Sequence, residues 1–521
     1  MSRRMKALPA ALACAFVLVP KGARAQGNYH STPNGGRSAL MGNTGEALGR
    51  DGASPFMNPA TIVRIHDTSF AFSMNFYSFT STHLSAYHQS GPVDAGRFPG
   101  VAPQDTSVTD NQITVIPTTL CLFVNVSGLS GDDPEEGVAD TSTRVGRQKL
   151  ALCLGNVERR ETLLPALNYR TTTPGGASQQ AGSLTGKWFR WRFGPSYAGY
   201  ITKELTIGLS LHGVYSHYGY HTDNTTVTSG GPGGGILSSV GSNGAGTAID
   251  LDPILGVTYK LKDRYTFGAS VQTPSAHVVG SFDGNLHEVY GGTALDNSVL
   301  TTGTGDFFAP TPARLSAGIG VKVASSLKVE VDGSYYFPMS SAMRSSLQGN
   351  TVTLNGVSAT STPFDATYAV RSRPTVNLGV GAEYFFSPRF SVLGGAGVDF
   401  SATPALDTTN FLGAFYKERT NRVVGSLGVG SFRNGEDFLV GTQVTYGWGD
   451  ALALNPYVLP NAYSTVHLQQ IGATVIFAGS TNFAAIKRAL KNVEKLVKPA
   501  ATPAAAPAAT PAATPNPAPP N

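Results

Sequence analysis

The sequence predicts an all-β protein, a transmembrane barrel of about 14 antiparallel strands. Three observations predict it: an N-terminal export signal, segments in which apolar and polar residues alternate, and connections that alternate between long and short. Charged residues make up only 14% of the chain, yet its mean hydropathy is −0.05. A strand with one face toward lipid and one toward a lumen has this average. The chain contains no apolar run long enough for a spanning helix, which excludes a helical membrane protein.

The export signal occupies residues 1–25. Arg3, Arg4 and Lys6 precede an apolar stretch, and Ala23-Arg24-Ala25 supplies the small residues that signal peptidase requires. We therefore expect a mature chain that begins at Gln26. The five positive residues of the signal account for the whole formal charge of +5, so the mature chain is neutral. This balance excludes a nucleic-acid-binding surface and predicts no nucleic-acid partner.

The alternation is clearest where Leu205, Ile207 and Leu209 share one face and Ser210 and His212 share the other. A charge that faces lipid at the midplane costs about 2–4 kcal/mol, so the charged faces of such strands are expected to line the lumen. Turn residues bound each alternating segment. Strands are predicted near residues 68–80, 112–126, 148–171, 187–201, 204–221, 247–260, 264–274, 312–323, 326–338, 374–386, 389–401, 421–431, 437–448 and 465–478.

The connections between these segments favour a barrel over a soluble sandwich. Outer-membrane barrels have short periplasmic turns, long outer loops and an even number of strands, which leaves both chain ends in the periplasm. Residues 127–147 depart from the scheme, because an acidic stretch falls where a short turn is expected. The expected short turns are Lys203-Glu204, Lys262-Asp263, Ala324-Ser325, Ser387-Pro388 and Asn434-Gly435. The expected long loops are residues 81–111, 222–246, 275–311, 339–373 and 402–420.

Residues 26–66 do not alternate and are rich in small and polar residues. They are too polar for lipid and too few to fold alone, so we expect them to fill the barrel. Here the sequence, from the stretch 36–47 to Asn58-Pro59-Ala60, resembles the FadL/TodX family, outer-membrane transporters of long-chain fatty acids and aromatic hydrocarbons. The resemblance extends over residues 36–477. It implies an N-terminal hatch whose motif residues are Gly42, Gly45, Asn58, Pro59 and Ala60. Met57 and Thr61 depart from the family pattern.

The third predicted strand changes its lipid face along its length. Leu150, Leu152 and Leu154 have even parity, whereas Leu163, Leu167 and Tyr169 have odd parity. A slip of one residue therefore falls within residues 155–161, where Gly155 is typical of a bulge. The resemblance implies a kinked third strand that opens the wall sideways, and an ordinary bulge is the alternative. The residues assigned to this opening are Gly155, Asn156, Val157, Glu158 and Arg159.

Arg190, Arg192 and His212 are the candidate ligand-binding residues of the lumen, because guanidinium groups hold a carboxylate by charge-assisted hydrogen bonds. Pairing of the two arginines with Asp250, Asp252 or Glu330 is the alternative. Cys121 and Cys153 lie on neighbouring strands and either form a disulfide or remain two thiols.

No catalytic set is recognisable. His212 lacks a suitably spaced nucleophile, and His217 and His221 beside Tyr215 fit an interfacial girdle better than a metal site. We therefore expect no enzyme, no metal and no cofactor.

The last part of the chain differs from a barrel. Apolar residues at helical spacing behind Thr481-Asn482 predict a basic amphipathic helix over residues 480–498, and residues 499–521 form a disordered tail rich in Pro and Ala. The expected domains are thus the signal at 1–25, the hatch at 26–66, the barrel at 67–479, the helix and the tail. Two alternatives remain open for the tail: it binds a periplasmic or cell-wall partner, or it is inert.

Together these features predict a passive outer-membrane transporter of long-chain fatty acids or other hydrophobic compounds, with membrane lipids around it. The alternative function is a structural or adhesive barrel that binds envelope partners through its loops and tail.

Overall fold

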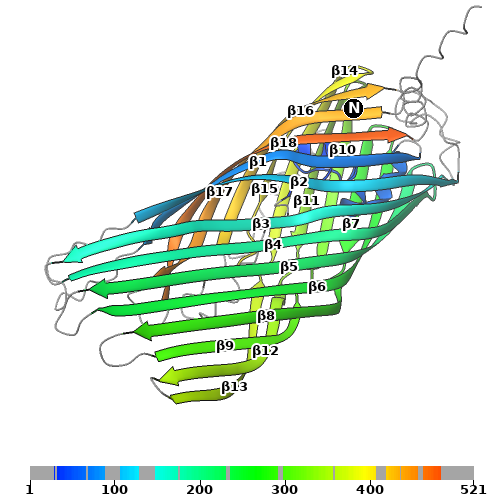
Figure 1. The fold of residues 1–521 in the computed structure, drawn as a ribbon. Coiled ribbons are helices and arrows are strands. Elements are labelled where there is room, and N and C mark those ends of the chain that lie inside the picture. Colours follow the sequence, from blue (N-terminus) through cyan, green and yellow to red (C-terminus); the bar gives the residue numbers. More distant parts are fainter. Residues whose placement is uncertain are drawn as a thin grey trace, which may run out of the picture.

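The structure is a computed structural model that describes residues 28–29, 32–65, 68–88, 106–127, 147–173, 176–229, 235–291, 297–355, 358–406, 418–433, 436–455 and 462–482. Within these residues one antiparallel sheet closes on itself, since β1 (Ser69–His88) pairs with both β2 (Thr106–Ser127) and β18 (Ala462–Asn482) (Figure 1). The other strands are β3 (Gln148–Thr173), β4 (Gly176–Tyr200), β5 (Leu205–Ser229), β6 (Ile236–Leu261), β7 (Tyr265–Gln272), β8 (Ala276–Gly291), β9 (Asn297–Phe308), β10 (Arg314–Ala324), β11 (Leu327–Tyr336), β12 (Met339–Asn355), β13 (Ser358–Ser372), β14 (Thr375–Ser387), β15 (Phe390–Asp399), β16 (Glu418–Arg433) and β17 (Glu436–Asn455).

These 18 segments make a closed barrel of 14 strands, as the sequence predicts. The numbers differ because β7–β8, β9–β10, β11–β12 and β13–β14 are each one wall strand interrupted near its middle. Every interruption contains proline, which lacks the N–H group that a ladder needs. The prolines at the breaks are Pro274, Pro310, Pro312, Pro338 and Pro374.

The apolar faces of the strands point outward, as the alternation predicts. The side chains of Ile207, Leu209 and Leu211 are 48%, 47% and 48% exposed, whereas Ser210 and His212 on the opposite face are buried. No helix among the described residues is long and apolar enough to cross a membrane.

Two of the expected long loops are largely strand. Residues 275–311 contain β8 and β9, and residues 339–373 contain β12 and β13, so two long hairpins extend the wall at the end opposite the short turns (Figure 1). The expectation was wrong because strands were recognised by one apolar face, and β13 is polar and exposed along most of its length. In a similar way β1 extends to His88 and β5 to Ser229.

Four of the expected short turns are described, and each connects two consecutive strands. Lys262 and Asp263 both have φ of 51°, the left-handed conformation of a type I′ hairpin. The Asn434-Gly435 turn, most of the 127–147 connection, the signal at 1–25 and the tail at 499–521 lie outside the described residues. At the C-terminal end β18 continues to Asn482, so Thr481 and Asn482 belong to a strand; the rest of the helix expected at 480–498 lies outside the described residues.

Residues 32–65 lie inside the barrel near the short turns and are called the inner segment (Figure 1). They contain α2 (Arg37–Leu40), α3 (Ser54–Met57) and η1 (Pro59–Arg64). Their backbone lies directly on glycines of the wall. A Cβ added to Gly268 would lie 1.9 Å from the Glu46 oxygen, and one added to Gly395 would lie 2.3 Å from the Gly42 nitrogen. Wall glycines therefore provide the space in which the inner segment packs.

Candidate functional site

The Asn-Pro-Ala motif fixes the end of the inner segment to β6. Asn58 is fully buried, and its Nδ2 donates to the carbonyls of Glu46 at 2.7 Å and Val257 at 3.1 Å. Its Oδ1 accepts from the Ala60 amide at 3.1 Å and so caps η1, with Pro59 at the first helical position. A Cβ on Gly256 would lie 2.0 Å from this Oδ1, so the motif requires glycine in the wall.

Gly42 and Gly45 are also placed at close contacts. Gly42 has φ of +71°, and a Cβ there would lie 2.6 Å from the Ala396 oxygen. Thr61, which departs from the family pattern, is accommodated because its hydroxyl donates to the Asn58 carbonyl at 2.8 Å.

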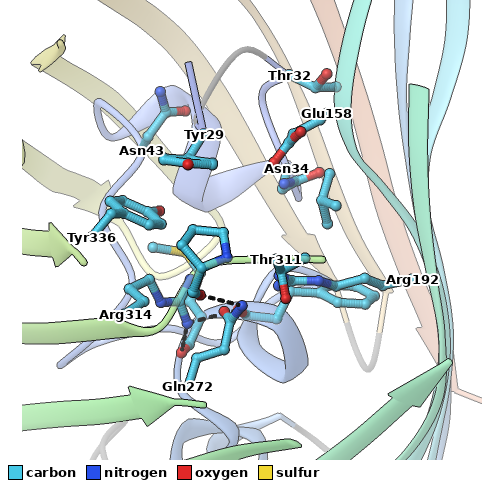
Figure 2. Close-up of a pocket in the computed structure, with 14 residues that line it drawn as sticks. Tyr29, Thr32, Asn34, Asn43, Glu158, Arg192, Gln272, Thr311, Arg314 and Tyr336 are labelled. Atoms are coloured by element: carbon cyan, nitrogen blue, oxygen red, sulfur yellow. Dashed lines mark hydrogen bonds between the residues drawn. The ribbon is translucent and has the colours of Figure 1, made fainter. Parts of the chain in front are cut away.

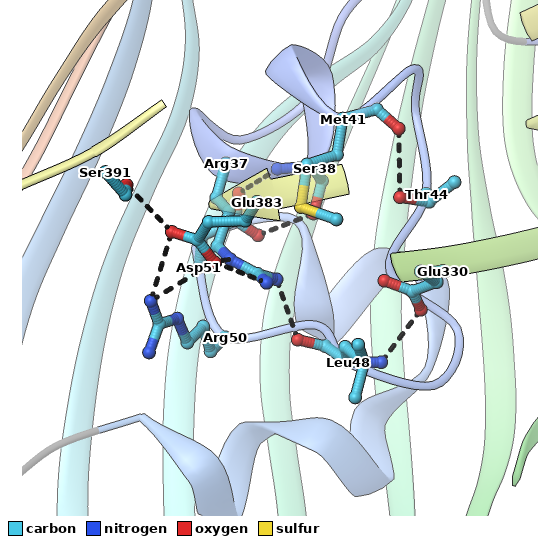
Figure 3. A network of polar contacts seen from close by, with 10 residues as sticks. All are labelled: Arg37, Ser38, Met41, Thr44, Leu48, Arg50, Asp51, Glu330, Glu383 and Ser391. Carbon is cyan, nitrogen blue, oxygen red and sulfur yellow. Dashed lines mark hydrogen bonds and ion pairs between the residues drawn. The ribbon is translucent and has the colours of Figure 1, made fainter. Parts of the chain in front are cut away.

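Two carboxylates of β11 bind consecutive amides of the inner segment. Asp332 accepts from the amides of Gly45 and Glu46 at 2.6 and 2.9 Å. Glu330 accepts from the next two amides, those of Ala47 and Leu48, at 2.7 and 2.8 Å, and Figure 3 shows the second of these bonds. The lumen charges of β11 therefore hold the inner segment in place.

Glu383 of β14 provides a second anchor. It forms ion pairs with Arg37 at 2.8 Å and Arg50 at 3.4 Å, and it accepts a hydrogen bond from Ser391 (Figure 3). Arg37 also donates to the Leu48 carbonyl at 2.9 Å, so one side chain joins both halves of the inner segment to the wall. Apolar contacts add to these polar anchors, since Leu40 packs with Leu393 and Leu439 of the wall and Phe56 packs in a cluster with Phe123.

One buried acid of the inner segment makes its attachment dependent on pH. Burial raises the pKa of the Glu46 carboxyl above its ordinary value of 4.5, and nearby Glu330 raises it further while Arg314 opposes the shift. The attached state therefore favours the protonated form. The contribution of Glu46 to attachment is therefore fully present below pH 4.5 and is lost as pH rises through the raised value.

We expect Glu46→Gln to reduce this pH dependence, because glutamine stays neutral. Hydrogen exchange of the amides at residues 45–48, measured between about pH 4 and 8, tests it. Exchange should accelerate less with pH in the variant than in the wild type, after correction for intrinsic rates. The exposed Glu204→Gln is the matched control and should behave as wild type. An identical profile in Glu46→Gln and wild type would contradict the assignment.

The ladder between β2 and β3 is short. It runs from Ser127 opposite Gln148 to Thr119 opposite Gly155, and among the described residues it goes no further. Cys121 and Cys153 face each other in it and form a disulfide, which decides between the two readings of the sequence. Beyond the ladder's end, described pairings join residues 106–117 of β2 to β1 and residues 156–173 of β3 to β4.

The expected slip in β3 is confirmed and lies at Val157. Asn156 pairs with Trp191 while Glu158 pairs with Arg190, so Val157 is the extra residue of a bulge. Before the bulge Leu152 is 58% exposed, whereas Asn156 is buried. A second irregularity between Leu164 and Leu167 shifts the register by one more residue, so Leu163 and Leu167 do not keep the common parity that the sequence predicted. The side chains of Leu163, Leu167 and Tyr169 lie outside what the structure describes.

The inner segment contacts the end of this ladder. A Cβ on Gly155 would lie 2.7 Å from the ring of Phe56, and one on Gly52 would lie 2.6 Å from the Thr119 hydroxyl. The Phe56 ring also lies 5.0 Å from that of His212. Movement of α3 would therefore change the environment of the ladder's last pair.

The candidate lumen cations have different surroundings. The Arg190 guanidinium is occupied by Glu158 at 2.9 Å, by Ser216 and by the Ala309 carbonyl. Arg192 forms an ion pair with Asp252 at 2.8 Å, one of the pairings that the sequence left open.

Arg159, the last residue assigned to the opening, pairs with Glu161 at 3.1 Å. His212 is buried, and its ring nitrogens have no hydrogen-bond partner among the described residues, so it forms no Ser–His pair there.

A cavity of about 50 Å³ lies between the inner segment, β3 and the wall strands β7, β10 and β11 (Figure 2). Arg192 and Arg314 line it, as does Gln272, whose Oε1 has no partner among the described residues. Phe56 and Val157 supply apolar surface at the same place. Because one water needs about 10–15 Å³ of such volume, the cavity has room for a small polar group and little more.

Sequence reasoning did not select Arg314, Gln272, Tyr29 or Tyr336, which also line this cavity. The alternation of lipid-facing and lumen-facing residues could have identified Arg314, because it lies on the face opposite the exposed Leu315 in β10. The cavity could not be predicted in this way, since it depends on how the inner segment folds against the wall.

A second, polar cavity of about 120 Å³ adjoins the unpaired parts of β2 and β3. Asp110, Gln112 and Thr114 line it from β2, and residues 159–161 line it from β3. Charged and amide side chains therefore face each other across the region where the ladder is absent.

Comparison with known proteins identifies the fold. No family model and no curated protein matches the chain. Among solved structures, the Pseudomonas putida toluene transporter TodX matches with a TM-score of 0.51 and 13% identity, over 88% of this chain and 99% of that one. The Ralstonia pickettii toluene transporter TbuX matches with a TM-score of 0.50 and 16% identity, over 88% and 99%. A Pseudomonas aeruginosa FadL homologue matches with a TM-score of 0.50 and 12% identity, over 88% and 100%. The chain therefore has a FadL/TodX-like barrel fold.

Proposed function

We propose that this protein is an outer-membrane channel through which hydrophobic monocarboxylic acids, such as long-chain fatty acids, enter the lumen and leave sideways between β2 and β3. In this proposal the long hairpins face outward, the chain ends face the periplasm and the inner segment is the hatch. The observation that carries it is the end of the β2–β3 ladder at Thr119 and Gly155, beside the bulge at Val157.

The lateral route rests on an argument about backbone groups. Lipid offers no hydrogen-bond partner, so strand edges without a ladder need water, protein or ligand on the lumen side. The polar cavity lined by Asp110 and Arg159 supplies such an environment. A cargo that crosses there meets a polar rim, which favours an amphipathic molecule over a plain hydrocarbon.

The substrate class rests on the small cavity beside Val157. Two guanidinium groups, those of Arg192 and Arg314, and the amide of Gln272 line it. Arg192 is paired with Asp252, and Arg314 donates to the Phe56 and Met57 carbonyls, so a carboxylate head group would replace the inner segment as the partner of Arg314. Phe56 lies between this cavity and the end of the ladder and offers apolar contact to the chain of the ligand. The cavity is too small for a whole fatty acid, so the proposal requires the inner segment to move when the ligand enters.

Gln272→Glu tests the substrate class. A carboxylate placed beside the two arginines repels or displaces the ligand's head group, so uptake of a long-chain fatty acid should fall at least about tenfold, corresponding to roughly 1.4 kcal/mol. Uptake of an uncharged aromatic hydrocarbon should persist. Both are measured with radiolabelled substrate in cells that lack other such channels. Gln272→Met is the control for lost hydrogen bonding alone and should have the smaller effect. Equal loss of both substrates in Gln272→Glu would refute the carboxylate site.

A further inference from the structure

The outer face of the sheet changes character in register across β4, β5, β6 and β8. The exterior row Trp191, Tyr215, Ile249 and Val279 is aromatic and aliphatic, and each member pairs with the next. Two residues further along each strand, toward the long hairpins, Phe189 stacks on His217 with ring centroids 4.7 Å apart. Aromatic rings of this kind mark the boundary between lipid and water.

Beyond that boundary the same face forms a groove of about 680 Å³ that spans β4 to β12. Its side chains share the parity of the lipid-facing residues below, so the groove is on the outside of the barrel and not in the lumen. Amides supply much of its lining, from Asn243, Asn285, Gln348 and Asn350, with threonine hydroxyls between them.

Register places these groups in two continuous rows. Asn243 pairs with Asn285, Asn285 with Thr302, and Thr302 with Asn350. In the second row, which is nearer the Phe189 and His217 rings, Asp283 pairs with Thr304 and Thr304 pairs with Gln348. Neighbouring strands lie about 4.8 Å apart, so each row presents donors and acceptors at that repeat.

The charge of the groove is balanced. Lys187 is 62% exposed and pairs with Glu161 at 3.5 Å, and Asp283 supplies an opposite charge. His221 lies 2.6 Å from Asp223. A polyanion such as a phosphate cluster would need excess positive charge, which these residues do not provide. Amides and hydroxyls suit a ligand that carries many neutral hydroxyl groups.

We infer that this groove binds the neutral hexose part of the saccharide carried by the outer-leaflet lipopolysaccharide. The occupant follows from position and chemistry together: the groove begins immediately above the Phe189–His217 pair, at the height of lipid head groups, and faces the surrounding lipid layer. The inference rests on the proposed outer-membrane orientation but not on transport. The saccharide would be held by the neutral rows, and the lipid part would lie against the aliphatic row beneath.

The test uses the mature full-length protein in a non-ionic detergent. The probe is core oligosaccharide released from lipid A and dephosphorylated, with binding followed by saturation-transfer NMR and calorimetry. We expect saturable binding that weakens at least about fivefold in the double variant Gln348→Leu/Asn285→Leu. Gln469→Leu, an exposed exterior amide on β18 outside the groove, is the matched control and should bind as wild type.

Heat-dependent gel mobility reports whether each variant keeps the closed barrel, and the single change Asn350→Ala serves if the double variant does not fold. Absence of binding by wild type, equal binding by a folded groove variant, or displacement of the probe by inorganic phosphate would each overturn the inference. Oligosaccharide binding by a channel that fails the fatty-acid test would leave the inference standing, so the failures of the two proposals are distinguishable.

Discussion

Deletion of Val157 is expected to reduce uptake of a long-chain fatty acid to the background of cells without the protein, while the barrel still folds. Val157 is the extra residue between the Asn156–Trp191 and Glu158–Arg190 pairs. Without it, one parity continues along β3 as far as the second irregularity at Leu164–Leu167, and the strand can extend its ladder with β2 past Gly155. A continuous ladder satisfies the backbone on both edges and closes the proposed lateral route. Uptake and surface abundance are measured in the same cells.

The matched control is deletion of Val278. This residue is the extra one of another bulge, where Ile249 pairs with Val279 and Asp250 with His277. It lies on β8, away from the β2–β3 edge, so the deletion repairs a bulge without touching the proposed opening. Normal uptake should persist. Normal uptake in the Val157 deletion, with normal surface abundance, would mean that the bulge in β3 has no role in transport, and the lateral route would be abandoned.

Local patterns in the sequence were sufficient for the barrel but not for its full height. Alternation at Leu205–Leu211 and the tight turn at Lys262-Asp263 identify strands and their connections because one face of each strand meets lipid. The β8–β9 and β12–β13 hairpins lack that contrast, so the same rule interprets them as loops. The prolines that interrupt the four wall strands also separated these hairpins from the segments that were recognised.

The site was predictable where it depends on which residues share a face of a strand. The slip in β3 and the lumen position of Arg190 and Arg192 follow from this alternation. The ion-pair partners of the two arginines could be predicted only in part. Arg192 pairs with Asp252, a neighbour two strands away, whereas Arg190 pairs with Glu158, whose orientation is set by the bulge.

Contacts of the inner segment were beyond local reasoning. Asp332 binds the amide of Gly45 across a sequence separation of 287 residues, and no spacing rule connects the two. The wall glycines that receive the segment, such as Gly256 under Asn58, are equally unremarkable in the sequence until the segment lies against them.

Removal of residues 26–57 is expected to convert a closed protein into an open pore while leaving the sheet intact. The inner segment contributes no strand to the wall. It is linked to the wall by ion pairs and hydrogen bonds, notably Arg37–Glu383 and the amides bound by Glu330 and Asp332, and by two apolar clusters around Leu40 and Phe56. The wall ladders do not include it, so the sheet can close without it. Single-channel recording in planar bilayers is the measurement, and we expect steady conductance where the full chain shows only brief openings.

A control separates loss of the plug from damage to the wall. Glu383→Gln weakens the pairs with Arg37 and Arg50 but keeps the whole segment, so it should give more frequent transient openings instead of a steady current. Arg389→Gln, at the turn after β14, carries no such pair in the described structure and should leave the closed state unchanged. If a truncated protein migrates as a closed barrel yet shows no conductance, the inner segment does not plug the pore. The proposal that this segment gates the channel would then be wrong.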